Sequence, residues 1–334
     1  MRTENQKGVT RAAIVGFGLI GRERLKALQS LAPSVVVVGV SDPALTSETL
    51  GGDVPLLPDL DALIRIEPDV VIVATPHDIA VPIVSTLLAT GTRVLIEKPL
   101  GRTGAEAEAL VLAQAHPGQL HVGFNYRFLA GVSALLSDAA AGWFGNLISA
   151  TMTLGHGGSP GDEETWKLDP QRAGGGCLLD PGVHAIDLLT VLLGTDLDVC
   201  GASTWKGFWN TGIEEEGHVL LRAPGGALGR AELSVARWRS TFRLEVNGTE
   251  GYGVVTGRGR SYGPQEYRRG RRWGWMNTGR QADSEELVVL DPGEESFVRE
   301  TEALLGFDVR SPCSAEHALL VMRLLDVVRD HASE

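Results

Sequence analysis

Asp180, His184 and Asp187 follow one another at intervals of four and three residues, which places them on one face of a predicted helix. An imidazole with a carboxylate one turn away is suited to proton transfer near neutral pH. Three glycines at 174–176 precede this helix and would let a ligand approach the backbone closely. Asp180 followed by Pro181 is also typical of a helix N-cap, and a lone histidine can be structural. The combination nevertheless favours a functional site.

A second candidate is the tripeptide Glu97-Lys98-Pro99, which closes the apolar run at residues 92–96. A charged pair directly after a buried strand indicates that the strand ends at a ligand site. In an open α/β sheet that site lies at the carboxyl ends of the strands. Lys98 would then be a cation held over the crevice, with its backbone restricted by Pro99. The alternative is a solvated Glu–Lys pair at a strand exit.

A glycine fingerprint follows the apolar strand predicted at Arg11–Val15 and opens the helix predicted at Leu19–Leu31. It reads Gly16-Phe17-Gly18-Leu19-Ile20-Gly21. In such a turn the first glycine permits the tight bend, the second lets the backbone approach a pyrophosphate, and the third lets helix and strand pack closely. The helix N-terminus presents free N–H groups and a positive dipole end to the phosphates. The pattern predicts a dinucleotide-binding site.

Asp42 comes shortly after the second predicted strand, Val35–Val40, and lies 21 residues after Gly21. An acidic residue at about this distance hydrogen-bonds the adenosine ribose of NAD and repels the extra phosphate of NADP. The alternative is a turn-forming role for Asp42 before Pro43. We predict NAD rather than NADP as the cofactor.

Residues 1–127 alternate strands and helices, which predicts a parallel, doubly wound sheet with helices on both faces. After Asp42 the expected helices are 60–66, 79–90 and 105–115, and the expected strands are 70–74, 93–96 and 120–124. Polar residues at two further strand ends are expected to face the same crevice as Lys98. They are Thr75, Pro76 and His77 after one strand, and Asn125, Tyr126 and Arg127 after the other.

Residues 128–334 change character, because strands now follow one another without intervening helices. This order predicts an α+β domain with an open, mostly antiparallel sheet. Its expected strands are 147–154, 199–204, 218–222, 227–235, 242–246, 253–256 and 287–290. Helices are expected at 132–140, 296–305 and 314–331, and the last of these is expected to pack back on the first domain.

Composition bounds the class of protein. A chain of 334 residues suggests two domains, and a net charge of −12 argues against nucleic acid as a partner. Cys177, Cys200 and Cys313 are too widely spaced for a disulfide framework or a metal-ligand cluster, so we expect no metal and a reducing cytoplasm. The longest apolar runs are strand-length, and the first ten residues lack an apolar leader, so no membrane association is expected.

Together these motifs resemble the Gfo/Idh/MocA family of nicotinamide-dependent oxidoreductases. The resemblance rests on the glycine fingerprint, Ala74-Thr75-Pro76, Glu97-Lys98-Pro99, the stretch Trp166-Lys167-Leu168-Asp169-Pro170, and the 174–176 glycines with Asp180 and His184. It implies an N-terminal Rossmann domain and a C-terminal domain with an open sheet that forms dimers or tetramers. The implied substrates are sugars, amino sugars or cyclitols, oxidised or reduced at one carbon.

The resemblance also implies residue roles. Lys98, Asp180 and His184 would be catalytic, with His184 as the general base and Lys98 stabilising charge on the reacting oxygen. The cofactor would contact Gly16, Phe17, Gly18, Leu19, Ile20, Gly21, Asp42, Thr75, Pro76, His77, Glu97, Lys98 and Asn125. The substrate would contact Lys98, Tyr126, Arg127, Trp166, Asp180 and His184. The family often has a histidine a few residues after Thr-Pro, but Ala80 stands near that place here.

Two alternative functions stay open: an NAD-dependent glycoside hydrolase of the same family, and a non-catalytic nucleotide-binding regulator. The acidic clusters 162–164 and 214–216 are expected to be solvated faces. The first could instead edge the substrate pocket and favour an amino sugar or aminoglycoside. The segment 258–280 holds seven arginines among aromatic residues, and we expect a surface loop, an oligomer contact or a substrate rim there.

Overall fold

The computed structural model of the protein describes residues 8–46, 54–292 and 295–333. The chain forms two compact units. The first contains the chain up to Phe124 together with Phe297–Leu319, and the second contains Asn125–Ser296 together with the chain from Leu320 onward. The predicted domain boundary at 127/128 and the packing of the last helix stay predictions. Residues 1–7, on which part of the expectation about a leader segment rests, lie outside the described part.

The first unit is built on a seven-stranded sheet in the order β15-β6-β5-β4-β1-β2-β3. All its pairs are parallel except β15 with β6. The strands are β1 Thr10–Val15, β2 Val35–Ser41, β3 Leu56–Leu57, β4 Val70–Val73, β5 Arg93–Glu97, β6 Leu120–Gly123 and β15 Cys313–Ser314. The helices are α1 Leu19–Ser30, α3 Leu60–Arg65, α4 His77–Ala89, α5 Gly104–Leu112 and α10 Ser296–Leu305. The order 3-2-1-4-5-6 is that of a Rossmann sheet, as predicted.

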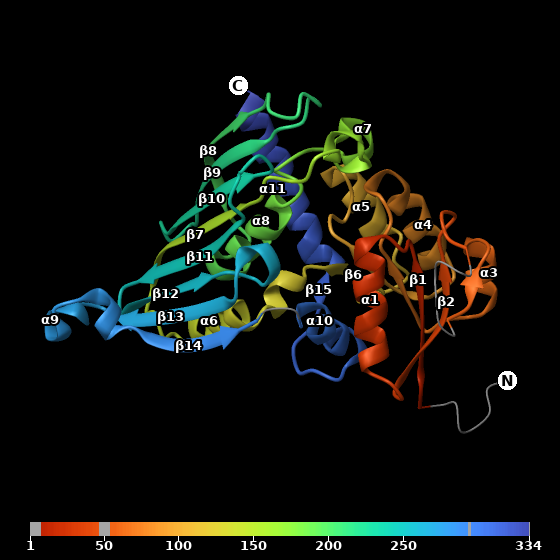
Figure 1. The fold of residues 1–334 in the computed structure, drawn as a ribbon, viewed down its shortest axis with the longest axis horizontal. Coiled ribbons are helices and arrows are strands. Elements are labelled where there is room, and N and C mark those ends of the chain that lie inside the picture. The colour runs from red at the N-terminus through yellow and green to blue at the C-terminus, as the bar shows by residue number, and fades with distance from the viewer. Residues whose placement is uncertain (1–7, 47–53, 293–294, 334) are drawn as a thin grey trace. The chain divides into compact units, whose positions relative to one another are not determined.

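The central strands of this sheet are apolar on both faces, which is why their sequences do not alternate. In β1 the residues from Ala12 to Val15 are buried, and β4 is buried throughout. Helices packed on both faces exclude water from such strands. Leu28 of α1 and Leu304 of α10 belong to the same core cluster as Ile14 and Ile72. The helices around this sheet are visible in Figure 1.

The second unit is built on an eight-stranded sheet in the order β14-β13-β12-β11-β7-β10-β9-β8. Only β10 with β7 is a parallel pair, which confirms the predicted mostly antiparallel sheet. The strands are β7 Leu147–Gly155, β8 Asp198–Trp205, β9 Glu216–Arg222, β10 Leu228–Ser234, β11 Thr241–Gly248, β12 Gly251–Thr256, β13 Gln265–Arg271 and β14 Glu286–Asp291. The main helices are α6 Ala130–Ala140, α8 Gly182–Leu193 and the later part of α11 Ala315–Ser333.

One face of this sheet is covered by helices. α8 packs on β7 and β10, and α6 packs on β12, β13 and β14. The strands alternate accordingly: in β9, Val219 and Leu221 are buried while His218 and Leu220 are exposed. This period of two is the pattern of a sheet with one core face.

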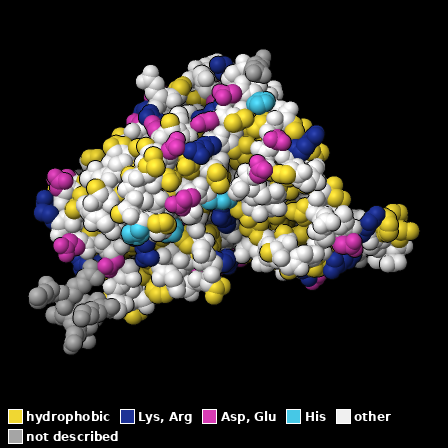
Figure 2. Space-filling model, turned by 180° about the vertical axis from the view of Figure 1, so that it is seen from behind, with side chains coloured by type: hydrophobic (Ala, Val, Ile, Leu, Met, Phe, Trp, Pro, Cys, Tyr) yellow, Lys and Arg dark blue, Asp and Glu magenta, His cyan; other side chains and the backbone are white. Residues whose placement is uncertain are grey.

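The arginine-rich segment 258–280 contains the strand β13, which the sequence reasoning missed. Arg269 pairs with Asp138 and Glu286, and Arg268 pairs with Glu266. These cations are therefore neutralised inside the unit. The segment also contains the short helix α9 Trp275–Thr278, in which Trp275 and Met276 are exposed. Figure 2 shows apolar side chains gathered at the projecting end of this unit, on the right of the view.

No helix in the described ranges is both long and apolar enough to cross a lipid bilayer.

Candidate active site

The glycine turn between β1 and α1 leaves space for a ligand. Gly16 has a φ of 86°, a left-handed conformation that favours glycine. A Cβ atom at Gly16 would lie 2.5 Å from the carbonyl oxygen of Ala74, and one at Gly21 would lie 2.2 Å from that of Gly16. Packing within the turn therefore requires both glycines. A Cβ at Gly18 would meet no described atom within 4 Å, so the start of α1 is open to an approaching pyrophosphate.

The side chains between these glycines lie differently. Phe17 is buried, Leu19 is exposed and Ile20 is half-buried. The turn therefore offers a ligand mainly its backbone, as a phosphate-binding turn does.

Asp42 holds the glycine turn from the end of β2. Its Oδ2 accepts a hydrogen bond from the N–H of Phe17 at 2.6 Å, and its Oδ1 accepts one from the N–H of Ala44 at 2.8 Å. Each carboxylate oxygen can accept a second hydrogen bond. Asp42 can therefore support the turn and still accept a ribose hydroxyl.

Thr75 and Pro76 lie between β4 and α4, and Thr75 borders the glycine turn. A Cβ at Gly16 would lie 2.9 Å from Thr75 Cγ2. The hydroxyl of Thr75 is buried and has no hydrogen-bond partner among the described residues. Buried polar groups are normally bonded, so this hydroxyl fits a site completed by a ligand. His77 begins α4 and is buried.

Glu97, at the end of β5, belongs to a buried ion-pair network. Its Oε1 accepts a hydrogen bond from Arg24 Nε at 2.6 Å, and Arg24 Nη2 donates to Glu300 Oε2 at 2.6 Å. Burial opposes the charge of Arg24, but the two carboxylates outweigh it and raise the pKa of the guanidinium. A Cβ at Gly123 would lie 2.8 Å from Arg24 Nη2, so this glycine makes room for the pair. A structural role is thus sufficient for Glu97, and its predicted contact with the cofactor stays a prediction, as does that of half-buried Lys98.

In the second unit, the segment that follows β6 meets α8. Tyr126 stacks on His184, with ring centroids 3.8 Å apart and planes at 7°. Arg127 Nε donates to Asp187 Oδ2 at 2.8 Å, and the guanidinium also bonds Oδ1. Asn125 Nδ2 donates to Ser296 Oγ at 3.0 Å. Tyr126 and His184 therefore contact each other, and Arg127 forms an ion pair with Asp187.

The prediction that Asp180 caps α8 is wrong. The helix begins at Gly182, Pro181 precedes it, and no side chain caps it. Residues 176–182 form turns of their own, in which the N–H of Asp180 donates to the carbonyl of Gly176 at 2.8 Å. Residues 182–190 of the helix are all buried, so α8 lacks the polar face expected from its spacing. The Asp180 carboxylate lies outside the helix and lines a cavity.

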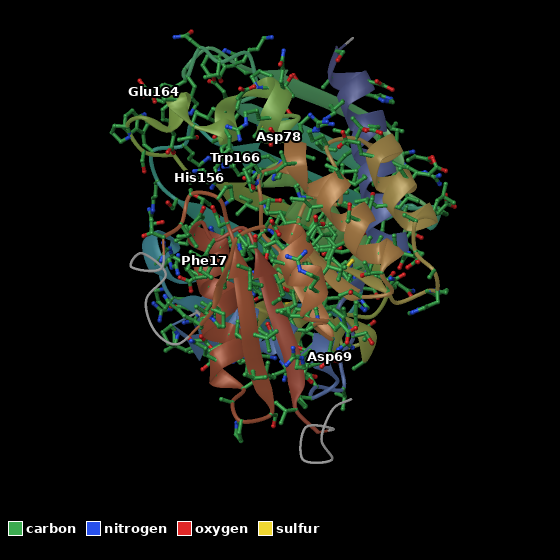
Figure 3. All side chains as sticks on the ribbon, turned by 90° about the vertical axis from the view of Figure 1, so that its right-hand side faces the viewer. Phe17, Asp69, Asp78, His156, Glu164 and Trp166 are labelled. Carbon is green, nitrogen blue, oxygen red and sulfur yellow. The ribbon has the colours of Figure 1, made fainter. Side chains whose placement is uncertain are left out.

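This cavity, called here the Asp180 pocket, has a volume of about 300 Å³. Its polar and aromatic lining residues are His156, Asp162, Thr165, Trp166, Lys167, Asp180 and Trp209. Trp166, His156 and Glu164 are labelled in Figure 3, where exposed Glu164 lies at the outer edge of the view. Of the acidic cluster 162–164, only Asp162 lines the described pocket.

His156 is a candidate site residue that the sequence reasoning missed. Its Nδ1 accepts a hydrogen bond from the N–H of Gly158 at 3.1 Å, which leaves Nε2 to carry the proton of the neutral ring. Burial lowers the pKa of His156, and the charge of Asp180 opposes that shift. His156 directly follows β7, and a polar residue at a strand end was the signal that singled out Lys98.

The expectation that the cluster 214–216 is solvated is wrong for Glu215, which is 0% exposed. Its carboxylate accepts hydrogen bonds from the N–H groups of Gly207, Phe208 and Trp209 at 3.2, 2.7 and 2.9 Å. These three donors compensate the burial of its charge. The donors lie six to eight residues before Glu215 in the loop between β8 and β9, and the folded path of this loop, which the sequence pattern does not specify, brings them to the carboxylate.

Two family models match the chain. Residues 10–124 match the NAD-binding Rossmann fold of an oxidoreductase family, and residues 137–253 match the GFO/IDH/MocA C-terminal domain. The trans-1,2-dihydrobenzene-1,2-diol dehydrogenase of Oryctolagus cuniculus is 30% identical over 246 residues, covering 71% of this chain and 73% of that protein. A levoglucosan dehydrogenase of Pseudarthrobacter phenanthrenivorans is 28% identical over 216 residues, covering 55% of each chain. A relative from Amycolatopsis mediterranei is 33% identical. The chain spans less than two thirds of the length of this relative and of the levoglucosan dehydrogenase.

Solved structures share the fold. A levoglucosan dehydrogenase in complex with NADH and levoglucosan has a TM-score of 0.82 at 22% identity, covering 97% of both chains. GenD2 from gentamicin A biosynthesis, in complex with NAD, has a TM-score of 0.77 at 24% identity and covers 100% of this chain and 97% of its own. The 3-ketoreductase KijD10 of Actinomadura kijaniata, in complex with NADP and TDP-benzene, has a TM-score of 0.77 at 21% identity, with 97% and 98% covered.

Proposed function

The chain belongs to the Gfo/Idh/MocA family of oxidoreductases, and we propose that it transfers a hydride between a nicotinamide dinucleotide and a CH–OH or keto carbon of a sugar, amino sugar or cyclitol. One observation carries this proposal: the same chain holds a Rossmann turn with open space at Gly18 and a small polar pocket around Asp180. The relatives that are dehydrogenases and reductases of sugars support it.

The bound nicotinamide would supply the hydride acceptor or donor. The backbone from Gly16 to Gly21, with Asp42 and Thr75, would hold the dinucleotide. His184 would take the hydroxyl proton as the carbonyl forms, and Lys98 would stabilise negative charge on the reacting oxygen. Asp180 would fix a neighbouring hydroxyl group of the sugar.

Turnover with a panel of glucose, glucosamine, levoglucosan and myo-inositol tests the proposal. We expect one reduced nicotinamide for each keto product. Hydrolysis of the glycosidic bond of levoglucosan to glucose without net consumption of NAD would instead identify the glycoside hydrolase. NAD binding without turnover in either direction would identify the regulator.

We predict a preference for NAD over NADP. Asp42 would accept hydrogen bonds from the ribose and repel a 2′-phosphate, and no arginine follows it at residues 43–45. The measurement is kcat/KM with each cofactor. Asp42→Ala should reduce the difference in kcat/KM between NAD and NADP, although it also removes the hydrogen bonds from the N–H groups of Phe17 and Ala44. Asp42→Asn, which keeps an oxygen acceptor for Phe17, is the control for loss of the turn. A wild-type preference for NADP would contradict the assignment.

We predict that an aminated sugar is preferred over its hydroxyl analogue at low ionic strength. Asp162 and Asp180 outnumber Lys167 among the charged residues that line the pocket, so they would raise the local concentration of a cationic substrate, an effect that salt screens. Neutralising Asp162, Glu163 and Glu164 together should raise KM for the aminated sugar, so that its advantage over the hydroxyl analogue is lost, and should leave kcat nearly unchanged. Glu163→Gln with Glu164→Gln is the matched control, because neither residue lines the described pocket. Equal efficiency on glucosamine and glucose at low salt would show that the acids are solvated surface.

We further predict a homodimer or homotetramer formed through the sheet of the second unit. Leu220 on β9 and Leu228 on β10 are 41% and 40% exposed on the face away from the helices. Exposed apolar side chains gathered on one sheet face are typical of a contact surface. Light scattering should give a multiple of the chain mass, and the double variant L220R/L228R should shift it towards the monomer. A monomeric wild-type protein would exclude this contact.

A further inference from the structure

A second cavity of about 650 Å³ adjoins the Asp180 pocket. The two share His156, Gly158, Asp162 and Trp209 among their lining residues, so they lie next to each other. The second cavity is distinguished by four aromatic side chains. We call these the aromatic groove: Phe208, Trp209, Trp238 and Tyr262.

Three of the four rings of the aromatic groove are joined by edge-to-face contacts that Phe208 makes with the two tryptophans. Phe208 lies 5.0 Å from Trp209 with the ring planes at 88°, and 5.9 Å from Trp238 with the planes at 84°. Trp238 is nevertheless 87% exposed and Phe208 is 44% exposed. A tryptophan that leaves most of its surface in water gains free energy when a ligand covers it. Grouped exposed aromatic residues beside a pocket therefore indicate a ligand surface.

The loop that carries two of these rings is held in place without a ligand. The buried carboxylate of Glu215 accepts the N–H groups of Phe208 and Trp209. The indole Nε1 of Trp209 donates to the carbonyl of Val235 at 2.9 Å. A ligand would therefore meet a preformed surface and lose little affinity to ordering the loop.

The polar groups of the groove select the kind of ligand. Ser240 and Ser261 contribute hydroxyls, and the charged residues of the lining are Asp162 and Arg258. Arg258 lies over the ring of Tyr262 at 3.9 Å, and its Nε is buried without a hydrogen-bond partner in the described part of the chain. One acid and one guanidinium leave the groove without excess charge. A neutral ring with apolar C–H faces and hydroxyls at its edge satisfies these groups, whereas a nucleoside diphosphate would lack compensating cations.

We propose that the aromatic groove binds a second glycosyl ring. The substrate would then be a glycoside of at least two rings, with the reacting ring in the Asp180 pocket and its neighbour on the indole of Trp238. This inference rests on the proposed function, since it extends the substrate of the same site.

The test compares single rings with matched two-ring sugars on the enzyme with NAD. Glucose is compared with maltose and cellobiose, and glucosamine with its 1,4-linked disaccharide. We expect kcat/KM to be about tenfold to hundredfold higher for a two-ring sugar than for the single ring, mainly because KM is lower. This is the size of effect that one well-packed aromatic contact contributes to binding. Trp238→Ala should remove this advantage and leave the single-ring values unchanged. Trp275→Ala is the matched control, because Trp275 is also exposed but lies in α9.

Binding of the same sugars, followed by quenching of tryptophan fluorescence, separates this inference from the proposed function. Binding of the two-ring sugar that depends on Trp238, without any hydride transfer, would retain the subsite and reject the oxidoreductase activity. Turnover that is equal for one and two rings, or that Trp238→Ala changes equally for both, would overturn the subsite and retain the activity. Competitive inhibition by UDP that Trp238→Ala relieves, without a two-ring advantage, would show that the groove holds a nucleotide and would also overturn the proposal.

Discussion

Replacing His184 by alanine should lower turnover by roughly two to four orders of magnitude, the usual contribution of a general acid–base group. The imidazole is stacked on Tyr126 and is only 3% exposed, so its orientation is fixed by packing. A fixed ring can accept a proton from a hydroxyl without first losing rotational freedom. NAD affinity, measured by calorimetry, should change little, because His184 belongs to the second unit and the glycine turn to the first.

Two comparisons make this result specific. His218→Ala removes an exposed histidine of β9 and should leave kcat unchanged. Lys98→Ala should lower turnover and also weaken NAD binding, because the resemblance places it beside the nicotinamide. Thermal unfolding of each variant controls for the loss of the Tyr126 stack. Near-normal turnover of a folded His184→Ala protein would show that the histidine is structural, and His156 would become the next candidate base.

Replacing Arg24 by methionine should destabilise the protein by about 3–5 kcal/mol, as expected when one partner of a buried ion pair is removed. Arg24 is fully buried and bonds both Glu97 and Glu300 at 2.6 Å. Its loss leaves the buried carboxylate of Glu300 and the half-buried carboxylate of Glu97 without their guanidinium. The measurement is the free energy of unfolding in urea at neutral pH, read from the midpoint and slope of the transition.

The controls separate charge from packing. Arg22→Met changes an exposed arginine two residues away and should alter the free energy of unfolding by less than about 0.5 kcal/mol. The triple variant R24M/E97Q/E300Q removes all three charges and should recover much of the lost stability, because an uncharged core avoids the desolvation penalty. An Arg24→Met protein as stable as the wild type would mean that water reaches the two carboxylates.

The alternation of elements and the dinucleotide turn could be predicted from the sequence because both are local signals. Buried parallel strands appear as short apolar runs, and a glycine turn between strand and helix has its own spacing. Most predicted elements in the described ranges lie within two or three residues of the observed ones, for example 296–305 for α10. The strand β13 escaped this reasoning because its arginines pair with acids of other segments, such as Asp138.

The candidate site residues of the second unit were predicted only in part. Asp180 and His184 were identified by their spacing, but the helix start was misplaced, because turns at 176–182 compete with capping by Asp180. His156 directly follows a strand and could have been identified by that position, whereas the aromatic groove gave no pattern in the sequence. Trp209 and Trp238 lie on different loops, and only the fold brings them to either side of Phe208.

By itself, then, the sequence determined the fold class, the dinucleotide turn and a short set of candidate residues, since each depends on neighbours along the chain. The tertiary structure decided what those residues contact. Glu215 looked like one of three solvated acids, yet it is buried because the loop at 207–209 folds over it and donates three N–H groups. Glu97 could be located at a strand end from the sequence, but its pairing with Arg24, 73 residues away, could not. The path of a folded loop and the pairing of segments far apart in the chain set the surroundings of these groups, and no local pattern of residues specifies either.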